Sequence, residues 1–279
     1  MISIEDVRFR YPSAKSDVLN SVTLNISDGE FVAIMGENGA GKTTLVKMLN
    51  GLLKPEKGRV IVDGSDTRSK SVAQLSRDVG LIFQNPDHQL FAETVSEELS
   101  FSLRNFGFPE DLIQRRVTKI LTSLDLEKYA NSSPFVLSGG ERKRVALAAV
   151  LVWNPKHIIM DEPTIGQDYL QKDRLRNFIL QLISQKKTII IVTHDVEFVA
   201  ECKPRVVLLS KGKVIADDSA TAILTKSELL EQASLVKPQI AELMQQLDEI
   251  GSPHNIIDPY GARAFLTPKL RTASKSTTK

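Results

Sequence analysis

Residues 36–44 read Gly36-Glu37-Asn38-Gly39-Ala40-Gly41-Lys42-Thr43-Thr44, which fits the phosphate-binding pattern G-x-x-x-x-G-K-[ST] at every fixed position. The apolar run of residues 31–35 before this stretch predicts a buried strand, and apolar residues at helical spacing after it predict an amphipathic helix. This order of strand, glycine-rich loop and helix is the context that the pattern requires. We therefore expect a phosphate-binding loop at this point of the chain.

The residue types in this loop suit an anion. Glycines allow the backbone to turn so that successive N–H groups point inward, and a helix that begins near Thr43 adds the positive end of its dipole. We expect Lys42 to reach the β- and γ-phosphates of a nucleotide and the Thr43 hydroxyl to bind Mg²⁺. The loop by itself indicates a nucleoside triphosphate and leaves kinases, GTPases and ATPases as alternatives.

Two adjacent acids form the second signal. Asp161 and Glu162 follow the apolar run of residues 157–160, at the carboxyl end of a predicted strand. A carboxylate in that position beside a phosphate loop commonly holds Mg²⁺, and the adjacent acid can polarise an attacking water molecule. His194 follows the next predicted strand, residues 188–192, and is a candidate to contact the γ-phosphate or to hold the attacking water.

The composition bounds the class of protein. The chain has 279 residues, of which 42% are hydrophobic and 25% charged, as in a globular protein with one large domain or with a small appendage besides. The net charge of +2, with both signs mixed along the chain, disfavours nucleic acid as a partner. The longest apolar run, Val145–Trp153, is shorter than the roughly 20 residues that span a bilayer, and the acidic start of the chain does not resemble a secretory signal. We expect contact with a membrane only through partners.

The order of the motifs resembles that of the ATP-binding cassette (ABC) ATPases. The motifs that match, in the sequence and spacing of that family, are the phosphate loop, Gln84, the signature Leu137-Ser138-Gly139-Gly140, Asp161-Glu162, Asp168 and His194. The Leu-Ser-Gly-Gly signature is specific to the family, whereas the phosphate loop is not. The resemblance covers about residues 1–216 and implies an ATPase that uses ATP and Mg²⁺.

The resemblance assigns a role to each matching residue. It makes Glu162 the general base, Asp161 a residue that orders Mg²⁺, and His194 a sensor of the γ-phosphate. Tyr11 stands where the family places an aromatic ring against adenine, and Gln84 links the metal and the attacking water to a transmembrane partner. The residues so implied are Tyr11, Gly36, Asn38, Gly39, Ala40, Gly41, Lys42, Thr43 and Thr44 for ATP; Glu162, His194, Gln84 and Lys42 for hydrolysis; and Thr43, Gln84 and Asp161 for Mg²⁺.

The family also implies a head-to-tail dimer with two nucleotides at its interface. In that arrangement, Ser138, Gly139, Gly140 and Asp168 of one subunit close over the ATP that the other subunit holds. One subunit does not complete a site on its own. The second ATPase is either another copy of this chain or a different chain.

The family further implies the fold and its division. We expect an α/β fold with a P-loop NTPase core, an N-terminal antiparallel β subdomain, an inserted helical subdomain and a small C-terminal helical extension. The expected boundaries are residues 1–219 for the ABC ATPase domain, with the helical subdomain at about 90–153, and residues 220–265 for an extension of two short helices. Residues 272–279 are polar and of low complexity, and we expect a flexible tail over residues 266–279.

Two stretches are similar to the ATPases of energy-coupling factor importers, which take up vitamins or transition-metal ions. They are Phe83-Gln84-Asn85-Pro86-Asp87-His88-Gln89-Leu90-Phe91 and residues 235–243. The subgroup implies a polytopic membrane coupling subunit and a small solute-binding membrane subunit as partners, with the ATPase as a peripheral protein at the cytoplasmic face of the cell membrane. In it, short helices of the membrane subunit dock beside Gln84, and we expect Leu90 and Phe91 to take part.

Two residues depart from the family pattern. The signature usually ends in Gln where this chain has Glu141, and the loop before Asp168 usually carries Leu where this chain has Gln167. Glu141 adds a negative charge near the nucleotide of the other subunit unless a cation pairs with it, and Arg142 and Lys143 are the candidates for that pairing.

Other functions stay open at this stage. The first alternative is the ATPase of another ABC transporter class. The second is a soluble ABC ATPase of translation or DNA repair, but those proteins usually carry two cassettes in one chain or a long coiled-coil insertion, and this chain shows neither. The third is a subunit that holds ATP without hydrolysing it, and the presence of Glu162 and His194 disfavours that reading.

Overall fold

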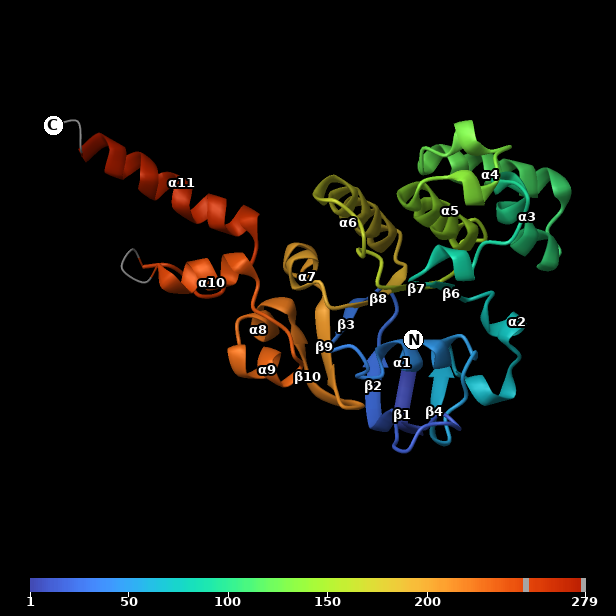
Figure 1. The fold of residues 1–279 in the computed structure, drawn as a ribbon, viewed down its shortest axis with the longest axis horizontal. Coiled ribbons are helices and arrows are strands. Elements are labelled where there is room, and N and C mark those ends of the chain that lie inside the picture. Colours follow the sequence, from blue (N-terminus) through green and yellow to red (C-terminus); the bar gives the residue numbers. More distant parts are fainter. Residues whose placement is uncertain (248–250, 277–279) are drawn as a thin grey trace.

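The computed structural model describes residues 1–247 and 251–276, and it places helices around two sheets (Figure 1). The larger sheet has the strand order β10-β9-β3-β8-β7-β6, in which β9 to β6 run parallel and β10 pairs antiparallel with β9. Its strands are β3 (Phe31–Met35), β6 (Val79–Ile82), β7 (His157–Asp161), β8 (Thr188–Thr193), β9 (Arg205–Ser210) and β10 (Lys213–Ser219). The predicted α/β fold with a P-loop NTPase core is confirmed.

The middle of the larger sheet is buried on both faces. Residues 189–192 of β8 are all 0% exposed, and Ile158 and Ile159 of β7 are 0% exposed as well. Parallel strands that are covered on both faces consist of continuous apolar runs rather than alternating residues. This explains why the sequence signals for these strands were short, unbroken apolar stretches that each end in a polar residue.

The smaller, N-terminal sheet is antiparallel, as predicted, with the order β2-β1-β4-β5. Its strands are β1 (Ile2–Phe9), β2 (Leu19–Ile26), β4 (Lys57–Val62) and β5 (Ser65–Asp66). Helix α1 (Lys42–Leu49) contributes Leu45 and Leu49 to a core that also contains Ile4 of the smaller sheet and Ile34 of the larger one. This shared core fixes the start of α1 and therefore the loop that precedes it.

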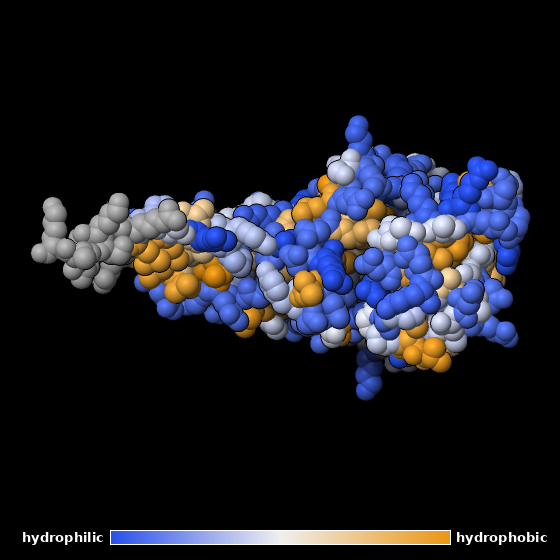
Figure 2. Space-filling view, turned by 90° about the horizontal axis from the view of Figure 1, so that it is seen from above, coloured by the Kyte–Doolittle hydropathy of each residue, from blue (hydrophilic) through white to orange (hydrophobic). Residues whose placement is uncertain are grey.

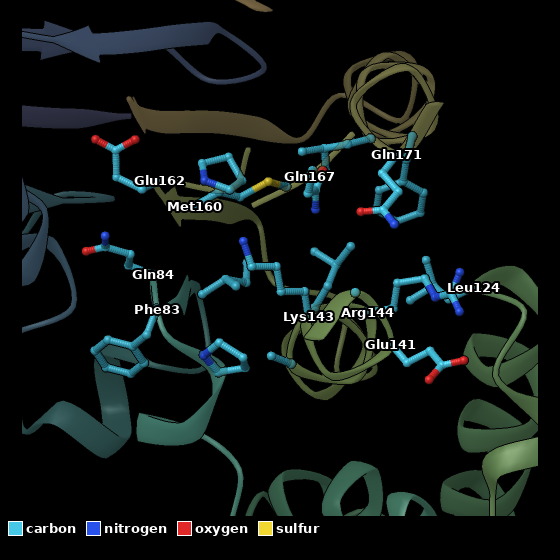
Figure 3. Close-up of a pocket in the computed structure, with 18 of the residues that line it drawn as sticks. Phe83, Gln84, Leu124, Glu141, Lys143, Arg144, Met160, Glu162, Gln167 and Gln171 are labelled. Carbon is cyan, nitrogen blue, oxygen red and sulfur yellow. The ribbon is translucent and has the colours of Figure 1, made fainter. Parts of the chain in front are cut away.

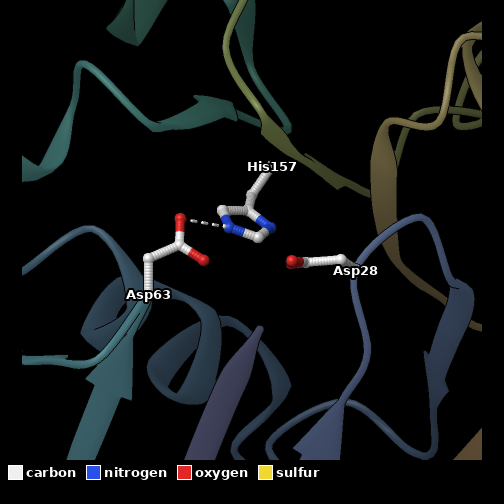
Figure 4. Close-up of side chains that lie close together, drawn as sticks. All are labelled: Asp28, Asp63 and His157. Carbon is white, nitrogen blue, oxygen red and sulfur yellow. Dashed lines mark hydrogen bonds and ion pairs between the residues drawn. The ribbon is translucent and has the colours of Figure 1, made fainter.

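A charged cluster joins the smaller sheet to the start of β7 (Figure 4). Asp63, which follows β4, accepts hydrogen bonds from His157 Nε2 at 3.0 Å and from Lys156 Nζ at 2.7 Å, and Asp28 lies 3.0 Å from Lys156 Nζ. The Met1 ammonium contacts both acids. Burial opposes the ionisation of Asp63, but the bonds from Lys156, Met1 and His157 outweigh it and hold its pKa well below the usual range. Since cations of the protein satisfy these acids, the cluster is an electrostatic link between the two sheets.

We expect the stability of the protein to fall as the pH drops below about 6.5, because burial lowers the pKa of His157 below that ordinary value. Between about pH 6.5 and the lower pKa of the folded state, His157 is protonated in the unfolded chain but neutral in the folded protein. The free energy of unfolding therefore decreases as the pH falls through this range. Urea unfolding at about pH 7.5 and about pH 5.5 measures this loss. Between these two pH values, His157→Gln should lose less free energy of unfolding than the parent. An equal loss in both proteins would show that His157 does not cause the pH dependence.

A helical block lies between β6 and β7 in the chain and occupies the upper right of Figure 1. It contains α3 (Val95–Asn105), α4 (Glu110–Ser123) and α5 (Gly139–Leu151), while the short α2 (Val72–Leu75) precedes β6. Thr94 caps α3 through a reciprocal capping box with Glu97. Leu99 of α3, Val117 of α4 and Val145 of α5 are buried in one core, so the block packs as a unit.

The last part of the chain is more helical than we expected. Helices α6 (Tyr169–Ser184) and α7 (Val196–Cys202) join the strands β7, β8 and β9. The expected pair of C-terminal helices is wrong, since the structure has α8 (Ala220–Leu224), α9 (Ser227–Gln232), α10 (Gln239–Gln246) and α11 (Pro259–Ser276). The short α8 and α9 have five and six residues, too few to give a helical repeat in the sequence.

The flexible tail expected from residue 266 is replaced by helix as far as Ser276, and residues 277–279 lie outside the described part of the chain. Ala, Leu, Lys and Arg recur along α11, and they are good helix formers even where the overall composition is polar. Helix α11 extends away from the two sheets, and apolar surface lies along α10 and α11, where Leu243 and Leu270 are exposed (Figures 1 and 2). Within the described ranges, no helix combines the length and apolar character that crossing a membrane needs.

Candidate nucleotide-hydrolysing site

The candidate site lies where three neighbouring strands end. The phosphate loop follows β3, Asp161 and Glu162 stand at the end of β7, and His194 follows β8, which pairs with both other strands. Parallel strands present their carboxyl ends at one edge of a sheet, and ligands of open α/β sheets bind at that edge. The topology therefore brings these separate sequence signals to one place.

Two glycines of the loop are required by close approach of the backbone. A Cβ on Gly36 would lie 2.0 Å from the carbonyl oxygen of Leu209, and a Cβ on Gly41 would lie 2.8 Å from that of Val18. Both glycines have positive φ, +145° and +99°, which side chains disfavour. Gly41 is the residue before α1, so the unpaired N–H groups of the first helical turn belong to this loop and are available to an anion.

Lys42 closes the loop on itself. Its ammonium donates to the carbonyl oxygens of Gly36 at 2.7 Å and Glu37 at 2.8 Å, and the residue is 6% exposed. Burial lowers the pKa of Lys42, and the charges of nearby carboxylates, Glu162 first among them, oppose that shift. An ammonium has three N–H donors, of which these bonds use two, so one is left for a phosphate oxygen.

Thr43 and Asp161 form the candidate metal site. Thr43 Oγ1 donates to Asp161 Oδ2 at 2.9 Å, and Asp161 Oδ1 is buried without a partner in the described part of the chain. Burial raises the pKa of Asp161, against the hydrogen bond from Thr43. A hydroxyl and a carboxylate with an unpartnered oxygen fit Mg²⁺, which takes oxygen ligands. Gln84, exposed in the loop after β6, lines the same pocket as Thr43.

Glu162 is held in one orientation. Its φ of +49° is unusual for a residue other than glycine, and its N–H donates to the carbonyl oxygen of Val192 at 2.8 Å. Oε1 lies 2.9 Å from Nδ1 of His194, whereas Oε2 is buried and has no hydrogen-bond partner among the described residues. Glu162 is 6% exposed, but the His194 side chain is 47% exposed. A strained backbone and an unpartnered carboxylate oxygen are features that cluster at functional sites.

A pocket of ≈ 380 Å³ brings most of the predicted residues together. Those that line it are Tyr11, Asn38, Gly39, Gly41, Lys42, Thr43, Thr44, Gln84, Glu162 and His194. The Tyr11 ring packs edge-on against Phe9 with centroids 4.9 Å apart, and its hydroxyl lies 3.1 Å from Thr44 Oγ1. Gly36 and Ala40 are buried and do not line the pocket.

Two residues of this pocket, Val18 and Ile165, are missing from the predicted set. Val18 precedes β2, and Ile165 lies in the loop between Glu162 and α6. Single apolar residues in loops carry no motif, so the sequence held no signal for either. Their position shows that the pocket has apolar as well as polar walls.

The signature residues begin α5, where Ser138 and Glu141 form a capping box. Glu141 Oε2 accepts from the backbone N–H of Ser138 at 2.9 Å and from its hydroxyl at 2.7 Å, and the Glu141 N–H points back at Ser138 Oγ. The Tyr129 hydroxyl donates to the other carboxylate oxygen. The bonds from Tyr129 and Ser138 lower the pKa of Glu141 to about 2.

The expected pairing of Glu141 with Arg142 or Lys143 is wrong. Arg142 forms an ion pair with Asp87 at 2.7 Å, and Lys143 donates to the carbonyl oxygen of Ile165. Residues one and two positions apart on a helix do not face each other, so Glu141 turns back to its own cap instead. A capping box accepts Glu and Gln alike, and thus Glu141 keeps the local geometry that the usual Gln provides.

A second cavity, of ≈ 280 Å³, lies between α5 and the side of the core formed by β7 and α6 (Figure 3). Its lining includes Gln84 and Glu162 and, from the signature, Ser138 and Gly140. Gly139 and Asp168 line neither cavity. Gly139 is the first residue of α5, and Asp168 caps α6 by accepting from the N–H of Gln171 at 2.8 Å. Ser138, Gly140 and Asp168 are thus not among the residues that line the phosphate pocket of their own subunit.

The loop and α1 can bind phosphates, and Glu162 stands beside them with a carboxylate oxygen that no other described group contacts, so fold and site together define a P-loop protein that hydrolyses nucleotides. The family model "ABC transporter" matches residues 19–165, and the chain belongs to this family. The energy-coupling factor transporter ATP-binding protein EcfA of Methanothermobacter thermautotrophicus is 39% identical over 253 residues, which are 90% of this chain and 81% of that protein. The resemblance to ABC ATPases of the energy-coupling factor type is confirmed, and the chain is an ATPase that binds ATP.

Solved structures agree with this placement. The structure of cbiO1 from Clostridium perfringens, described as part of the ABC transporter complex cbiONQ, matches with a TM-score of 0.74 and 32% identity over 90% of this chain and 96% of that chain. The ATP-binding cassette MJ0796, in a dimeric post-hydrolysis state bound to ADP and Pi, matches with a TM-score of 0.72 and 29% identity over 79% of this chain and 99% of that chain. The cassette MJ0796, whose fold this chain shares, is thus described as a dimer.

Proposed function

We propose that this chain uses ATP and Mg²⁺ to energise an energy-coupling factor importer for a vitamin or a transition-metal ion, as a peripheral subunit at the cytoplasmic face of the membrane. The observation that carries hydrolysis is the position of Glu162, which lines the same pocket as Lys42 and Thr43 with its Oε2 buried and unpartnered. The relation to EcfA and cbiO1 supports the importer class.

Each polar group of the pocket has a task in this proposal. The loop N–H groups and Lys42 bind the phosphates, and Thr43 with Asp161 holds Mg²⁺, which neutralises phosphate charge when it is bound. Glu162 Oε2 accepts a proton from the attacking water. His194, through its 2.9 Å contact with Oε1, keeps the carboxylate aimed into the pocket.

The remaining predicted residues act across a dimer in this proposal. Ser138, Gly139 and Gly140 at the start of α5, together with Asp168 at the start of α6, close over the nucleotide of the other subunit. Their absence from the lining of their own phosphate pocket supports this arrangement. The first turn of α5 also offers N–H groups and a positive helix end to a phosphate.

A pair of exposed aromatic rings supports a docking surface for the membrane partner. Phe91 and Phe101 are 58% and 47% exposed and stack edge-on with centroids 4.7 Å apart. The Glu98 carboxylate, which is buried, accepts from the N–H groups of Phe91 and Ala92 at 2.8 Å each and so fixes the loop that presents the ring. Leu90, which we expected to take part, is 4% exposed and belongs to the core. We therefore assign docking to Phe91 and Phe101 rather than to Leu90.

Phe91→Glu is expected to reduce copurification with the membrane subunits by at least about tenfold, because apolar aromatic anchors dominate interface energies. ATP binding by the isolated variant should match that of the parent, since Phe91 does not line the phosphate pocket. Leu180→Glu, at an apolar residue of α6 that is 46% exposed, serves as the matched control. Unchanged copurification and transport with Phe91→Glu would rule out this docking surface.

A further inference from the structure

Lys143 spans the second cavity. It lies on α5, one turn after the signature, and its ammonium donates to the carbonyl oxygen of Ile165 in the loop that leads to Asp168. In Figure 3 its side chain leaves α5 toward the side of the cavity from which Gln167 comes. Lys143 thus connects the two segments that carry Ser138 and Asp168, which the proposed function places over the nucleotide of the other subunit.

Gln167 places a buried hydrogen-bond acceptor without a described partner at the same cavity. Its backbone N–H bonds to the carbonyl oxygen of Thr164 at 3.1 Å, but its side-chain Oε1 is buried and without a hydrogen-bond partner in the described part of the chain. A buried acceptor without a partner destabilises the fold, and in a native protein such a group calls for an explanation. Lys143 has three N–H donors, and the bond to Ile165 uses one of them.

The donor and the acceptor stand on opposite walls. Lys143 belongs to the helical block, whereas Gln167 belongs to the loop between β7 and α6, and both line the ≈ 280 Å³ cavity. At Gly140 the two walls lie close together, since a Cβ on that residue would lie 3.3 Å from the side-chain amide nitrogen of Gln171. An approach of α5 toward α6 would shorten the distance between the donor and the acceptor.

We propose that Lys143 and Gln167 form a polar pair that positions the Asp168 loop against the signature helix when the dimer closes over ATP. Lys143 Nζ then bridges the Ile165 carbonyl oxygen and Gln167 Oε1. This pair gives a reason for Gln167 where the family usually has Leu, and it rests on the proposed composite site. Both are positioning residues, because neither lines the phosphate pocket.

The pair predicts opposite effects of one substitution on stability and on activity. Gln167→Leu removes an unsatisfied buried acceptor, so the isolated subunit should unfold at a higher temperature than the parent. Turnover of ATP by the dimer should nevertheless fall by about tenfold, because a misplaced group can cost that much or more. A residue with a structural role alone would move both quantities in the same direction.

The experiment compares Lys143→Met, Gln167→Leu and the double variant with the parent. It measures the unfolding temperature, the affinity of the subunit for MgATP, and steady-state ATP turnover. Turnover is measured at protein concentrations that populate the dimer. We expect unchanged MgATP affinity in all three and a loss of turnover in the double variant no larger than in the worse single variant, since the pair acts as a unit. Lys119→Met, an exposed residue of α4, should match the parent in all three measurements.

Ser138→Ala separates failure of this pair from failure of the composite site. If Ser138→Ala lowers turnover while Lys143→Met and Gln167→Leu both leave it at the parent rate, the pair is refuted and the composite site stands. If Ser138→Ala also leaves turnover unchanged, the composite site fails and the pair fails with it. Independent, additive losses from Lys143→Met and Gln167→Leu would likewise overturn the pairing.

Discussion

Glu162→Gln is expected to lower ATP turnover by about 10³-fold and to leave MgATP binding intact, because general bases contribute rate factors of this order. The amide keeps the size of the side chain and can still accept a hydrogen bond from His194 Nδ1, 2.9 Å away in the parent, but it cannot take a proton from water. Lys42 and Asp161 are untouched. Single-turnover hydrolysis and equilibrium binding of MgATP, measured on the same preparation, test both parts of this expectation.

The matched control for this variant is Glu228→Gln, at an exposed residue of α9 that does not line the pocket. It should hydrolyse ATP at the parent rate. If Glu162→Gln also turned over at the parent rate once assembled with its partners, the role of general base would have to be withdrawn. If it failed to bind MgATP, the substitution would have disturbed the loop rather than the chemistry.

Lys42→Met is expected to weaken both binding and hydrolysis of ATP by about 10²- to 10³-fold, as does the removal of a preorganised charge from a buried site. Two effects combine here. The variant loses the ammonium that we propose binds the phosphates, and the carbonyl oxygens of Gly36 and Glu37 lose the donor that holds the loop in shape. Arginine should not rescue the loss, because its planar guanidinium does not fit where Lys42 is 6% exposed.

Titration of ATP into the variant, followed by fluorescence or calorimetry, measures the first effect, and steady-state hydrolysis measures the second. Lys119→Met controls for the loss of a positive charge at an exposed position. MgATP affinity within twofold of the parent would show that the loop holds phosphate through its backbone alone. In that case the contribution assigned to Lys42 would be wrong.

Much of the site could be predicted because it is built from short motifs at strand ends. The phosphate loop, Asp161, Glu162 and His194 each follow an apolar run, and parallel pairing of β3, β8 and β7 brings them to one edge. Such motifs can be recognised from a few neighbouring residues, and the topology of the fold then brings them together in space. Residues such as Val18 and Ile165, which enter the pocket only because of the path of a loop, leave no trace in the sequence.

Predictions that depended on side-chain direction were less successful. Arg142 and Lys143 are neighbours of Glu141 in the sequence, but the helix points them elsewhere, while Tyr129 reaches Glu141 from a separate turn. Leu90 and Phe91 are adjacent as well, yet one is buried and the other exposed. The flexible tail expected from the polar composition of the C-terminal segment was also wrong, because helix-forming residues among the polar ones extend α11 to Ser276.

Affinity copurification of the tagged protein from detergent-solubilised membranes, with partners identified by mass, tests the importer function most directly. We expect a polytopic coupling subunit and a small solute-binding membrane protein to be recovered together with this chain. The presence or absence of a second ATPase in the same complex would decide between two identical and two different ATPase subunits. Recovery of ribosomes or chromatin, with no membrane subunit, would contradict the importer and leave only the ATPase cassette.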